Sequence, residues 1–427
     1  MAPITDHPLR YKLANELHAR PFPSMSAPCS AVYIAIKQPN DAVSRDRSGD
    51  LVHLTALLDR HGAPHPQPGA THYYGQIGKH WLKWEQHTEF VTYTAFTDGP
   101  VRRAFDPAEF DVFPADWLDQ APGQRITSVL LNIVPKPREA DEITSRLEDW
   151  FVSESLAVSS VLDEAAVVAG DFRIDLNGHL RFAVFADAQT GARRIGRIVQ
   201  RLCEIETYKT MSMLGFARVR AMQPGLNELD TKLTGLMGAM SDESASAEET
   251  LHDLLAISAE LETLSARSSF RFGATGAYEA LVNQRIEALR EDRFQGRQHF
   301  AEFMMRRYAP AMRTVNSAAR RLEAMSSRSI RASNLLRTRV DVERSAQNQS
   351  LLESMDRRSD LQLRLQRTVE GLSVVAISYY AVSLVGYLMY PLTQATGLSK
   401  GMLTALATLP VVLLVWALVR RLRKSVE

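Results

Sequence analysis

Residues 371–390, GLSVVAISYYAVSLVGYLMY, form the stretch that decides the fold. It contains no ionisable side chain except tyrosine, and twenty helical residues at roughly 1.5 Å each match the roughly 30 Å hydrocarbon core of a bilayer. A second apolar run, MLTALATLPVVLLVWALV, covers residues 402–419, and neighbouring helices can satisfy the carbonyl that its Pro410 leaves free. Together the two runs predict a transmembrane hairpin with a basic tail over residues 371–424.

Basic residues flank this hairpin at both outer ends. Four precede it and four follow it, whereas the joining segment carries only Lys400: Arg357, Arg358, Arg364 and Arg367, then Arg420, Arg421, Arg423 and Lys424. By the positive-inside rule both flanks are cytoplasmic. Two helices buried in a large soluble core are the alternative, but such a pair would not need basic clusters at its outer ends. We therefore predict that Arg364, Arg367, Arg420 and Arg421 contact lipid headgroups.

The composition is that of a folded protein with an uneven charge. The 427 residues are 45% hydrophobic and 23% charged, with room for two or three domains. Residues 1–190 carry 17 Lys and Arg against 25 Asp and Glu, so the remainder has a net excess of nine basic residues. Without an aromatic-interleaved basic motif, this asymmetry favours lipid headgroups or another subunit and disfavours nucleic acid. The distant Cys29 and Cys203 fit a reducing compartment, and the charged N-terminus lacks a signal peptide's apolar core.

Residues 1–188 predict a mixed α/β cytoplasmic domain. Leucine spacing indicates helices over 7–19 and 48–61, and a third is expected over 140–151. Strands are indicated at 31–36 and 128–134, with two or three antiparallel strands over 71–96. The pair Asn177-Gly178 predicts a hairpin between residues 165–176 and 180–186.

Residues 189–310 predict a helical region, because strand signals vanish after Asp187. Helices are expected over 190–222 and 227–240, interrupted at Gln223-Pro224-Gly225, and another from 241–249 to about Arg267. The two glycines of FRFGATGAY, residues 270–278, indicate a further break.

A long stalk helix is predicted over residues 311–370, which contain neither proline nor glycine. It would be about 90 Å long. Apolar residues recur in this region with the seven-residue repeat that is typical of a coiled coil in an oligomer. They are Tyr308, Met312, Val315, Ala319 and Leu322, and then Leu365, Val369 and Leu372. The repeat weakens between residues 326 and 349, which leaves a break there open.

Three long motifs carry a resemblance to a known family. HPLRYKLANELHARPF begins at His7, SFRFGATGAYEALVNQRIEALRE at Ser269, and LLRTRVDVERSAQNQSLLESMDRRSDLQLRLQRTVEGLSVVAISYY at Leu335. The chain resembles, over essentially its whole length, a proteobacterial family of predicted membrane-anchored proteins with a domain of unknown function. The resemblance implies an inner-membrane location and an uncharacterised cytoplasmic part, and it supplies no activity.

The layout is also similar to that of the CorA superfamily of divalent-cation transporters. In that superfamily a cytoplasmic α/β domain and a long stalk helix lead into two spans, and five subunits assemble with the first spans lining the pore. The defining Gly-Met-Asn is missing here, where residues 385–391 read VGYLMYP. No functional residue is therefore carried over.

One side of the first predicted span is rich in hydroxyl groups. On a helix turning 100° per residue, six residues fall within an arc of about 100°: Ser373, Ala376, Tyr380, Ser383, Tyr387 and Tyr390. This face predicts either a pore lining that exchanges hydrogen bonds with a hydrated ion, or helix packing by serines and interfacial anchoring by tyrosines. The joining segment PLTQATGLSKG has no carboxylate to concentrate Mg²⁺, which counts against cation passage.

Other candidate sites are weaker. Pro64 and Pro66 disrupt the helical spacing of a His61–His65 zinc pair. His80, Glu85 and His87 could approach one another on a hairpin and form a metal site. However, one of His80 and Glu85 has an even number and the other an odd number, so on a single strand their side chains point to opposite faces.

The segment His18-Ala19-Arg20-Pro21 predicts a helix end, or an anion contact through Arg20. No P-loop, dinucleotide-binding glycine motif or nucleophile elbow is present, so we expect no enzyme activity, no cofactor and no metal site.

The sequence thus predicts an α+β cytoplasmic domain, a helical region with a long stalk, and a two-helix transmembrane hairpin. The leading hypothesis is a CorA-like homo-oligomer of the inner membrane, a pentamer if the likeness holds, that passes ions along its first span. A membrane-tethered scaffold or sensor without transport is the alternative.

Overall fold

The computed structural model describes residues 4–16, 22–39, 45–240, 242, 245–389, 391 and 399–426. The chain divides into two compact units. The first unit comprises Met1–Asp242 and His252–Ala332, and the second comprises Glu243–Leu251 and Ser333–Glu427.

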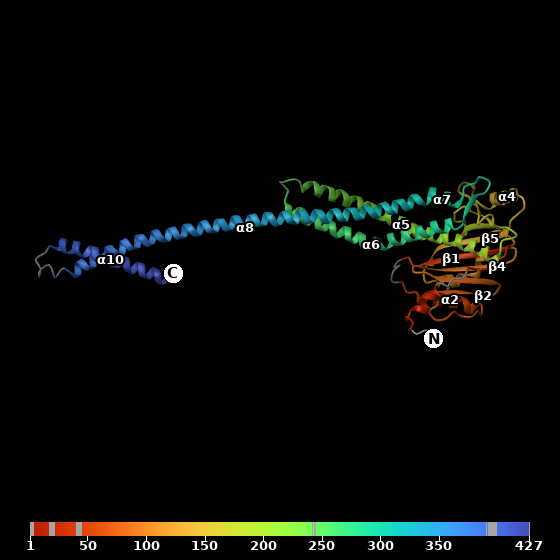
Figure 1. Cartoon of the computed structure of the whole chain (residues 1–427), viewed down its shortest axis with the longest axis horizontal. Helices are drawn as coiled ribbons and strands as arrows, with labels where there is room; N and C mark the ends of the chain where they lie inside the picture. Colours follow the sequence, from red (N-terminus) through yellow and green to blue (C-terminus); the bar gives the residue numbers. More distant parts are fainter. Residues whose placement is uncertain are drawn as a thin grey trace. The chain divides into compact units, whose positions relative to one another are not determined.

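A mixed nine-stranded sheet lies at one end of the first unit, and the long helices of the unit extend away from it (Figure 1). Its spatial order is β2-β3-β4-β1-β5-β8-β7-β6-β9, and all neighbours are antiparallel except β5 and β8. The strands are β1 (Cys29–Lys37), β2 (His72–Ile77), β3 (His80–Gln86), β4 (Phe90–Asp98), β5 (Gln124–Pro135), β6 (Ala157–Val161), β7 (Ala166–Gly170), β8 (Leu180–Ala186) and β9 (Glu291–Arg293). The strands expected at 31–36, 71–96, 128–134 and 180–186 are confirmed, whereas β6 and β9 were not predicted.

Strand β1 is buried on both faces, and its side chains alternate between two cores. Ala31, Tyr33 and Ala35 contribute to one core, and Val32 and Ile34 contribute to the other. Such alternation is what a pleated strand imposes. The sheet is therefore covered on both sides.

Short helices cover one face of the sheet and long helices cover the other. On the first face lie α2 (Ser48–Arg60), α3 (Ala115–Leu118), α4 (Ala140–Trp150) and two 3₁₀ turns, η1 (Pro107–Val112) and η2 (Ser153–Ser155). On the second lie α5 (Ala192–Ala239), α6 (Ala247–Glu287), α7 (Phe300–Arg307) and the beginning of α8 (Ala309–Leu388). Helices α2 and α4 match their predicted ranges, and α1 (Arg10–Glu16) lies within the range expected for the first helix.

Two predicted interruptions are wrong, because tertiary packing overrides local sequence signals. Helix α5 continues through Pro224, since Met222 and Leu226 on either side of it stay buried on one face. Helix α6 likewise continues through residues 270–278. Thr275 in that stretch is 1% exposed and lies directly against Gly215 of α5. A side chain larger than hydrogen at position 215 would collide with Thr275.

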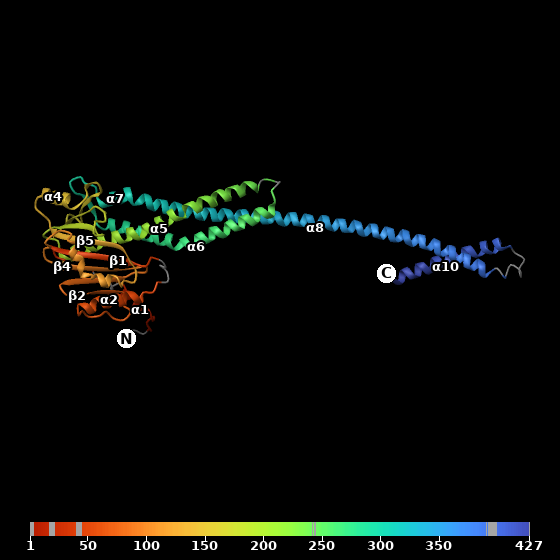
Figure 2. The same cartoon turned by 180° about the vertical axis from the view of Figure 1, so that it is seen from behind.

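Helix α8 is continuous for 80 residues, so the break left open between residues 326 and 349 does not occur. In the second unit, α8 ends at Leu388 and α10 (Lys400–Val426) follows, with Pro410 inside it. The two helices lie side by side in both opposed views (Figure 2). Both are long and apolar enough to cross a membrane. The structure thus confirms the two apolar helices of the predicted hairpin.

Candidate functional site

The end of α8 packs against α10 through one side. Ser378 is 7% exposed, and a Cβ at Gly386 would lie 3.5 Å from Oγ1 of Thr404. Val415 of α10 is also buried. The two helices are antiparallel neighbours, and the small residues Ser378 and Gly386 let them approach closely.

The predicted hydroxyl face lies on the opposite side of α8. At 100° per residue, Tyr380 and Tyr387 stand about 160–180° from Ser378, and their side chains are 69% and 73% exposed. Ser373 is exposed and Ser383 is half-buried, and each donates its hydroxyl hydrogen to the carbonyl four residues earlier. Tyr390 lies outside the described residues. Most of the hydroxyl face is therefore turned away from α10, although the Tyr387 ring lies within 5.6 Å of the Lys400 ammonium group at the start of α10.

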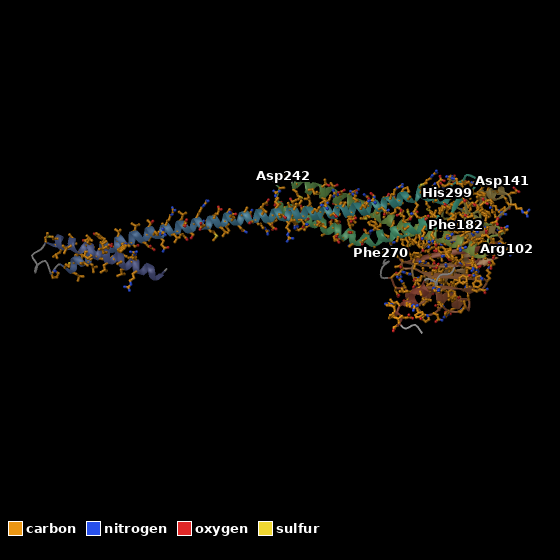
Figure 3. The ribbon with its side chains drawn as sticks, viewed as in Figure 1. Arg102, Asp141, Phe182, Asp242, Phe270 and His299 are labelled. Atoms are coloured by element: carbon orange, nitrogen blue, oxygen red, sulfur yellow. The ribbon has the colours of Figure 1, made fainter. Side chains whose placement is uncertain are left out.

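An apolar stripe continues this same side of α8 toward its N-terminal part. Every residue from 341 to 369 is exposed, and their side chains stand out around α8 (Figure 3). Five apolar residues that are 55–67% exposed share an arc of about 100° with the hydroxyl face: Leu351, Met355, Leu365, Val369 and Leu372. A long helix with one exposed apolar stripe normally packs along another helix.

The four arginines expected at headgroups lie at one end of the α8–α10 pair. Arg364 and Arg367 precede the apolar part of α8 and are exposed. Because α10 is antiparallel to α8, Arg420 and Arg421 come back to the same end, where the Arg420 guanidinium lies 5.0 Å from the ring centre of Trp416. Lys400 lies near the other end, 5.6 Å from the ring centre of Tyr387.

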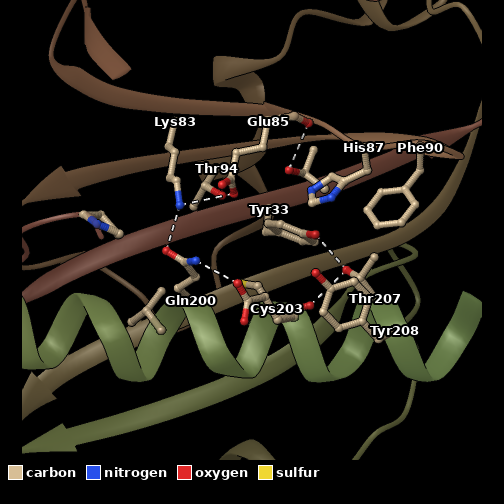
Figure 4. A pocket seen from close by; sticks show the side chains of 14 residues that line it. Tyr33, Lys83, Glu85, His87, Phe90, Thr94, Gln200, Cys203, Thr207 and Tyr208 are labelled. Carbon is tan, nitrogen blue, oxygen red and sulfur yellow. Dashed lines mark hydrogen bonds and ion pairs between the residues drawn. The ribbon is translucent and has the colours of Figure 1, made fainter. Parts of the chain in front are cut away.

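A buried polar network joins the sheet to α5, as Figure 4 shows, and continues to Arg285 of α6. Lys83 on β3 is 4% exposed; its Nζ lies 3.1 Å from Glu85 and donates to Oε1 of Gln200 at 2.7 Å. Gln200 donates in turn to Glu204 at 2.7 Å, and Arg285 of α6 donates to the other oxygen of Glu204. Each charged group has a partner of opposite charge, as burial requires.

The cavity beside this network holds about 20 Å³, room for about one water molecule. Tyr33 closes it through a 2.7 Å hydrogen bond with Thr207. Burial and the nearby Glu204 carboxylate raise the pKa of the Cys203 thiol above its ordinary value, so the thiolate that a nucleophile needs is disfavoured. The arrangement is suited to holding α5 against the sheet.

The buried carboxylate of Glu89 is contacted by side chains from the motif at residues 269–291. Glu89 is 2% exposed and accepts hydrogen bonds from Arg271 and from the Tyr278 hydroxyl, the latter at 3.0 Å. The Tyr278 ring stacks on Tyr208 of α5 with 5.7 Å between ring centres. These contacts could not be predicted from the sequence, because residues 270–278 were expected to interrupt the helix.

The histidines singled out in the sequence do not converge. His80 pairs with Thr97, His87 stacks on Phe90 with 4.4 Å between ring centres, and His65 bonds Asp59 at 2.6 Å. Glu85 belongs to the network with Lys83. Within the described part of the chain, no group of three or more His, Cys, Asp or Glu side chains is arranged to hold a metal ion. The segment His18 to Pro21 lies outside the described residues.

Two buried histidines, His53 and His179, and the half-buried His80 lead us to predict that acid destabilises the first unit. Burial lowers the pKa of His53, of His179 and of His80, the last to about 4 with help from Lys79 and His61. In the unfolded chain their pKa returns to about 6.5, so the unfolded state binds more protons below that pH. The contribution to the free energy of unfolding is full above pH 6.5 and is lost as the pH falls toward 4.

Urea unfolding of the protein at pH 7.5 and pH 5.0 measures this effect. We expect a lower midpoint at pH 5.0 and a smaller difference in a His80→Asn variant. Equal midpoints at the two pH values would refute it.

These features define a two-unit protein: a mixed α/β unit covered by long helices, and a unit with two candidate membrane-spanning helices. The chain belongs to a family described as a protein of unknown function, DUF3422, whose sequence model matches residues 5–426. This confirms the family resemblance over the whole chain. No curated protein and no solved structure matched in the same comparisons.

Proposed function

We propose that the chain forms a membrane-anchored homo-oligomer in which α8 helices from several copies surround a central axis and pass ions along it. One observation carries the proposal. A single side of α8 bears both the exposed apolar stripe from Leu351 to Leu372 and the hydroxyl face from Ser373 to Tyr387, and α10 lies opposite. Copies that pack through the stripe would bring their hydroxyl faces together.

The exposed stretch of α8 supports a partner of the same kind. A helix of this length gains most of its stability from packing, yet every residue from 345 to 369 is exposed in the single chain. A second copy supplies the same stripe in the same register, so a parallel bundle buries each stripe against its equivalents. The likeness to the CorA layout adds a pentamer as the expected assembly.

The basic residues support a cytoplasmic placement of both flanks at an inner membrane. Arg364, Arg367, Arg420 and Arg421 share one end of the α8–α10 pair, where headgroup phosphates of the cytoplasmic leaflet would lie. The opposite end of the α8–α10 pair, near Leu388 and Lys400, is then at the outer side of the membrane.

Cysteine cross-linking tests the assembly. Leu365→Cys lies on the stripe, and Leu363→Cys, about 160° away on the same turn, is the matched control; their leucines are 67% and 51% exposed. Mild oxidation of membranes should link copies through residue 365 and leave residue 363 unlinked. Equal cross-linking at the two positions, or no cross-linking at residue 365, would show that copies of the chain do not pack through the apolar stripe.

Flux through liposomes tests ion passage. Purified full-length protein should release K⁺, Mg²⁺ or Cl⁻, and Tyr380→Phe with Ser383→Ala should change the rate or selectivity. Ser378→Ala removes a hydroxyl from the side that faces α10 and should leave both unchanged.

The second candidate function is a membrane-tethered scaffold or sensor. The hydroxyls of Ser373 and Ser383, already bonded to carbonyls of their own helix, favour it. So does the joining segment PLTQATGLSKG, which has no carboxylate. Cross-linking at Leu365→Cys without any ion flux would support this function and reject the pore.

A further inference from the structure

A cavity of about 580 Å³ opens between the start of α5 and the end of α6 in the first unit. Its polar lining is dominated by arginines: Arg194, Arg197, Arg201 and Arg290, with Gln284 and Glu287. The first three are spaced by three and four residues, which places them on one face of α5 within an arc of about 60°. The volume is in the range of small-molecule sites.

Carboxylates neutralise only part of this charge. Asp163 lies 3.6 Å from Arg194 and 2.8 Å from Arg290, so one carboxylate serves two guanidinium groups. Glu287 supplies a second negative charge at the rim. Four positive charges against two negative ones leave the cavity with a net charge of about +2.

Hydrogen bonds to backbone carbonyls account for two of the arginines, and one of these carbonyls lies at the end of α6. Arg201 donates to the carbonyl of Ala288 at 2.8 Å, and Arg194 donates to the carbonyl of Leu162 at 2.6 Å. Cations at the carboxyl end of a helix are favourable in themselves. Arg197 is exposed and lines the same cavity, and among the described residues it makes neither a hydrogen bond nor an ion pair, so its guanidinium group is available to a ligand.

Repulsion among the cations also remains. Burial, followed by the neighbouring Arg197 and Arg285 charges, lowers the pKa of Arg201. A bound anion would relieve this repulsion, because it would place negative charge between the guanidinium groups.

We infer that this cavity binds a phosphate-bearing ligand, with Arg197 and Arg201 holding the phosphate group. Guanidinium forks match the oxygens of a phosphate in pairs, and a phosphate monoester carries close to the two negative charges that the cavity lacks. The same chemistry is offered by free phosphate compounds and by a lipid with a phosphomonoester headgroup. The inference stands apart from the proposed ion pathway, since all of its residues belong to the first unit.

Ligand-dependent thermal stability of the full-length protein in neutral detergent tests this inference. Two probes separate the sources: inorganic phosphate, and short-chain phosphatidic acid, each titrated at constant ionic strength with chloride as the reference anion. Arg197→Gln with Arg201→Gln should weaken the response at least about tenfold, since two charge-assisted contacts are lost. Arg102→Gln with Arg103→Gln, at two exposed arginines elsewhere in the unit, should respond like the unaltered protein.

A response to inorganic phosphate that the double variant loses supports a soluble ligand. A response to phosphatidic acid alone, lost in the same variant, supports a lipid headgroup. Arg197→Lys keeps the positive charge but loses the paired N–H donors of the guanidinium group, so it should bind with intermediate affinity. This variant keeps the test valid if the double variant does not fold. No response to either probe, or a response that survives in the double variant, overturns the inference.

Discussion

A chain that ends after Arg367 is expected to move from the membrane fraction to the soluble fraction. The truncation removes the apolar end of α8 and the whole of α10, the two stretches that are long and apolar enough to span a bilayer. It keeps the whole first unit and its sheet. An 18-residue apolar window favours lipid over water so strongly that the change in partition should be nearly complete. Alkaline carbonate extraction of membranes, followed by detection of the chain in pellet and supernatant, measures it.

The matched control ends after Arg421 and removes only the last residues of the tail. This chain retains both apolar helices and should stay in the carbonate-resistant pellet. Recovery of the two shortened chains in the same fraction would contradict the assignment of residues 371–419 to the membrane.

Replacing Asp50 by alanine is expected to lower the free energy of unfolding of the first unit by about 3–5 kcal/mol. Asp50 is fully buried at the first turn of α2 and accepts two hydrogen bonds from Arg45, at 2.9 and 2.6 Å. The Arg45 side chain is only 2% exposed, so the substitution leaves an unpaired cation inside the unit. The midpoint and slope of urea unfolding give the change.

The exposed pair Arg60–Asp116 provides the control. Its atoms are 2.7 Å apart, yet the Asp116 side chain is 68% exposed and water screens the pair. Asp116→Ala should therefore leave the unfolding midpoint nearly unchanged. A double variant, Arg45→Met with Asp50→Leu, should recover much of the stability lost in Asp50→Ala, because no buried charge then lacks a partner. Similar losses for Asp50→Ala and Asp116→Ala would show that burial of the pair is unimportant.

The sequence predicted those elements whose signals are local. Buried or alternating β-rich runs identified β1, β3, β4 and β8, and the absence of proline and glycine identified α8. Failures came where tertiary contacts decide the outcome. Pro224 and the glycines near Thr275 are ordinary helix breakers, but packing on both sides of them holds α5 and α6 continuous. Strand β9 has three residues and exists only because β6 offers its edge.

The candidate sites divide in the same way. Helical periodicity placed Ser373, Tyr380, Ser383 and Tyr387 on one face, and only the structure shows that α10 lies on the opposite side. The three arginines of α5 could have been noticed from their spacing. Arg290 and the Ala288 carbonyl at the end of α6, which complete the cavity, come from about ninety residues further along the chain, and spacing does not reveal them.

Strand β9 also bears on how the protein is made. Glu291, at its start, accepts a hydrogen bond from Ser159 of β6, and the two residues are 132 positions apart. A ribosome delivers the chain from its N-terminus, so β6 is synthesised long before the strand that covers it. Until both long helices have emerged, the nascent chain presents an open β-edge that neighbouring polypeptides could join. Translation of this protein therefore has a vulnerable interval that closes only when residue 293 leaves the exit tunnel.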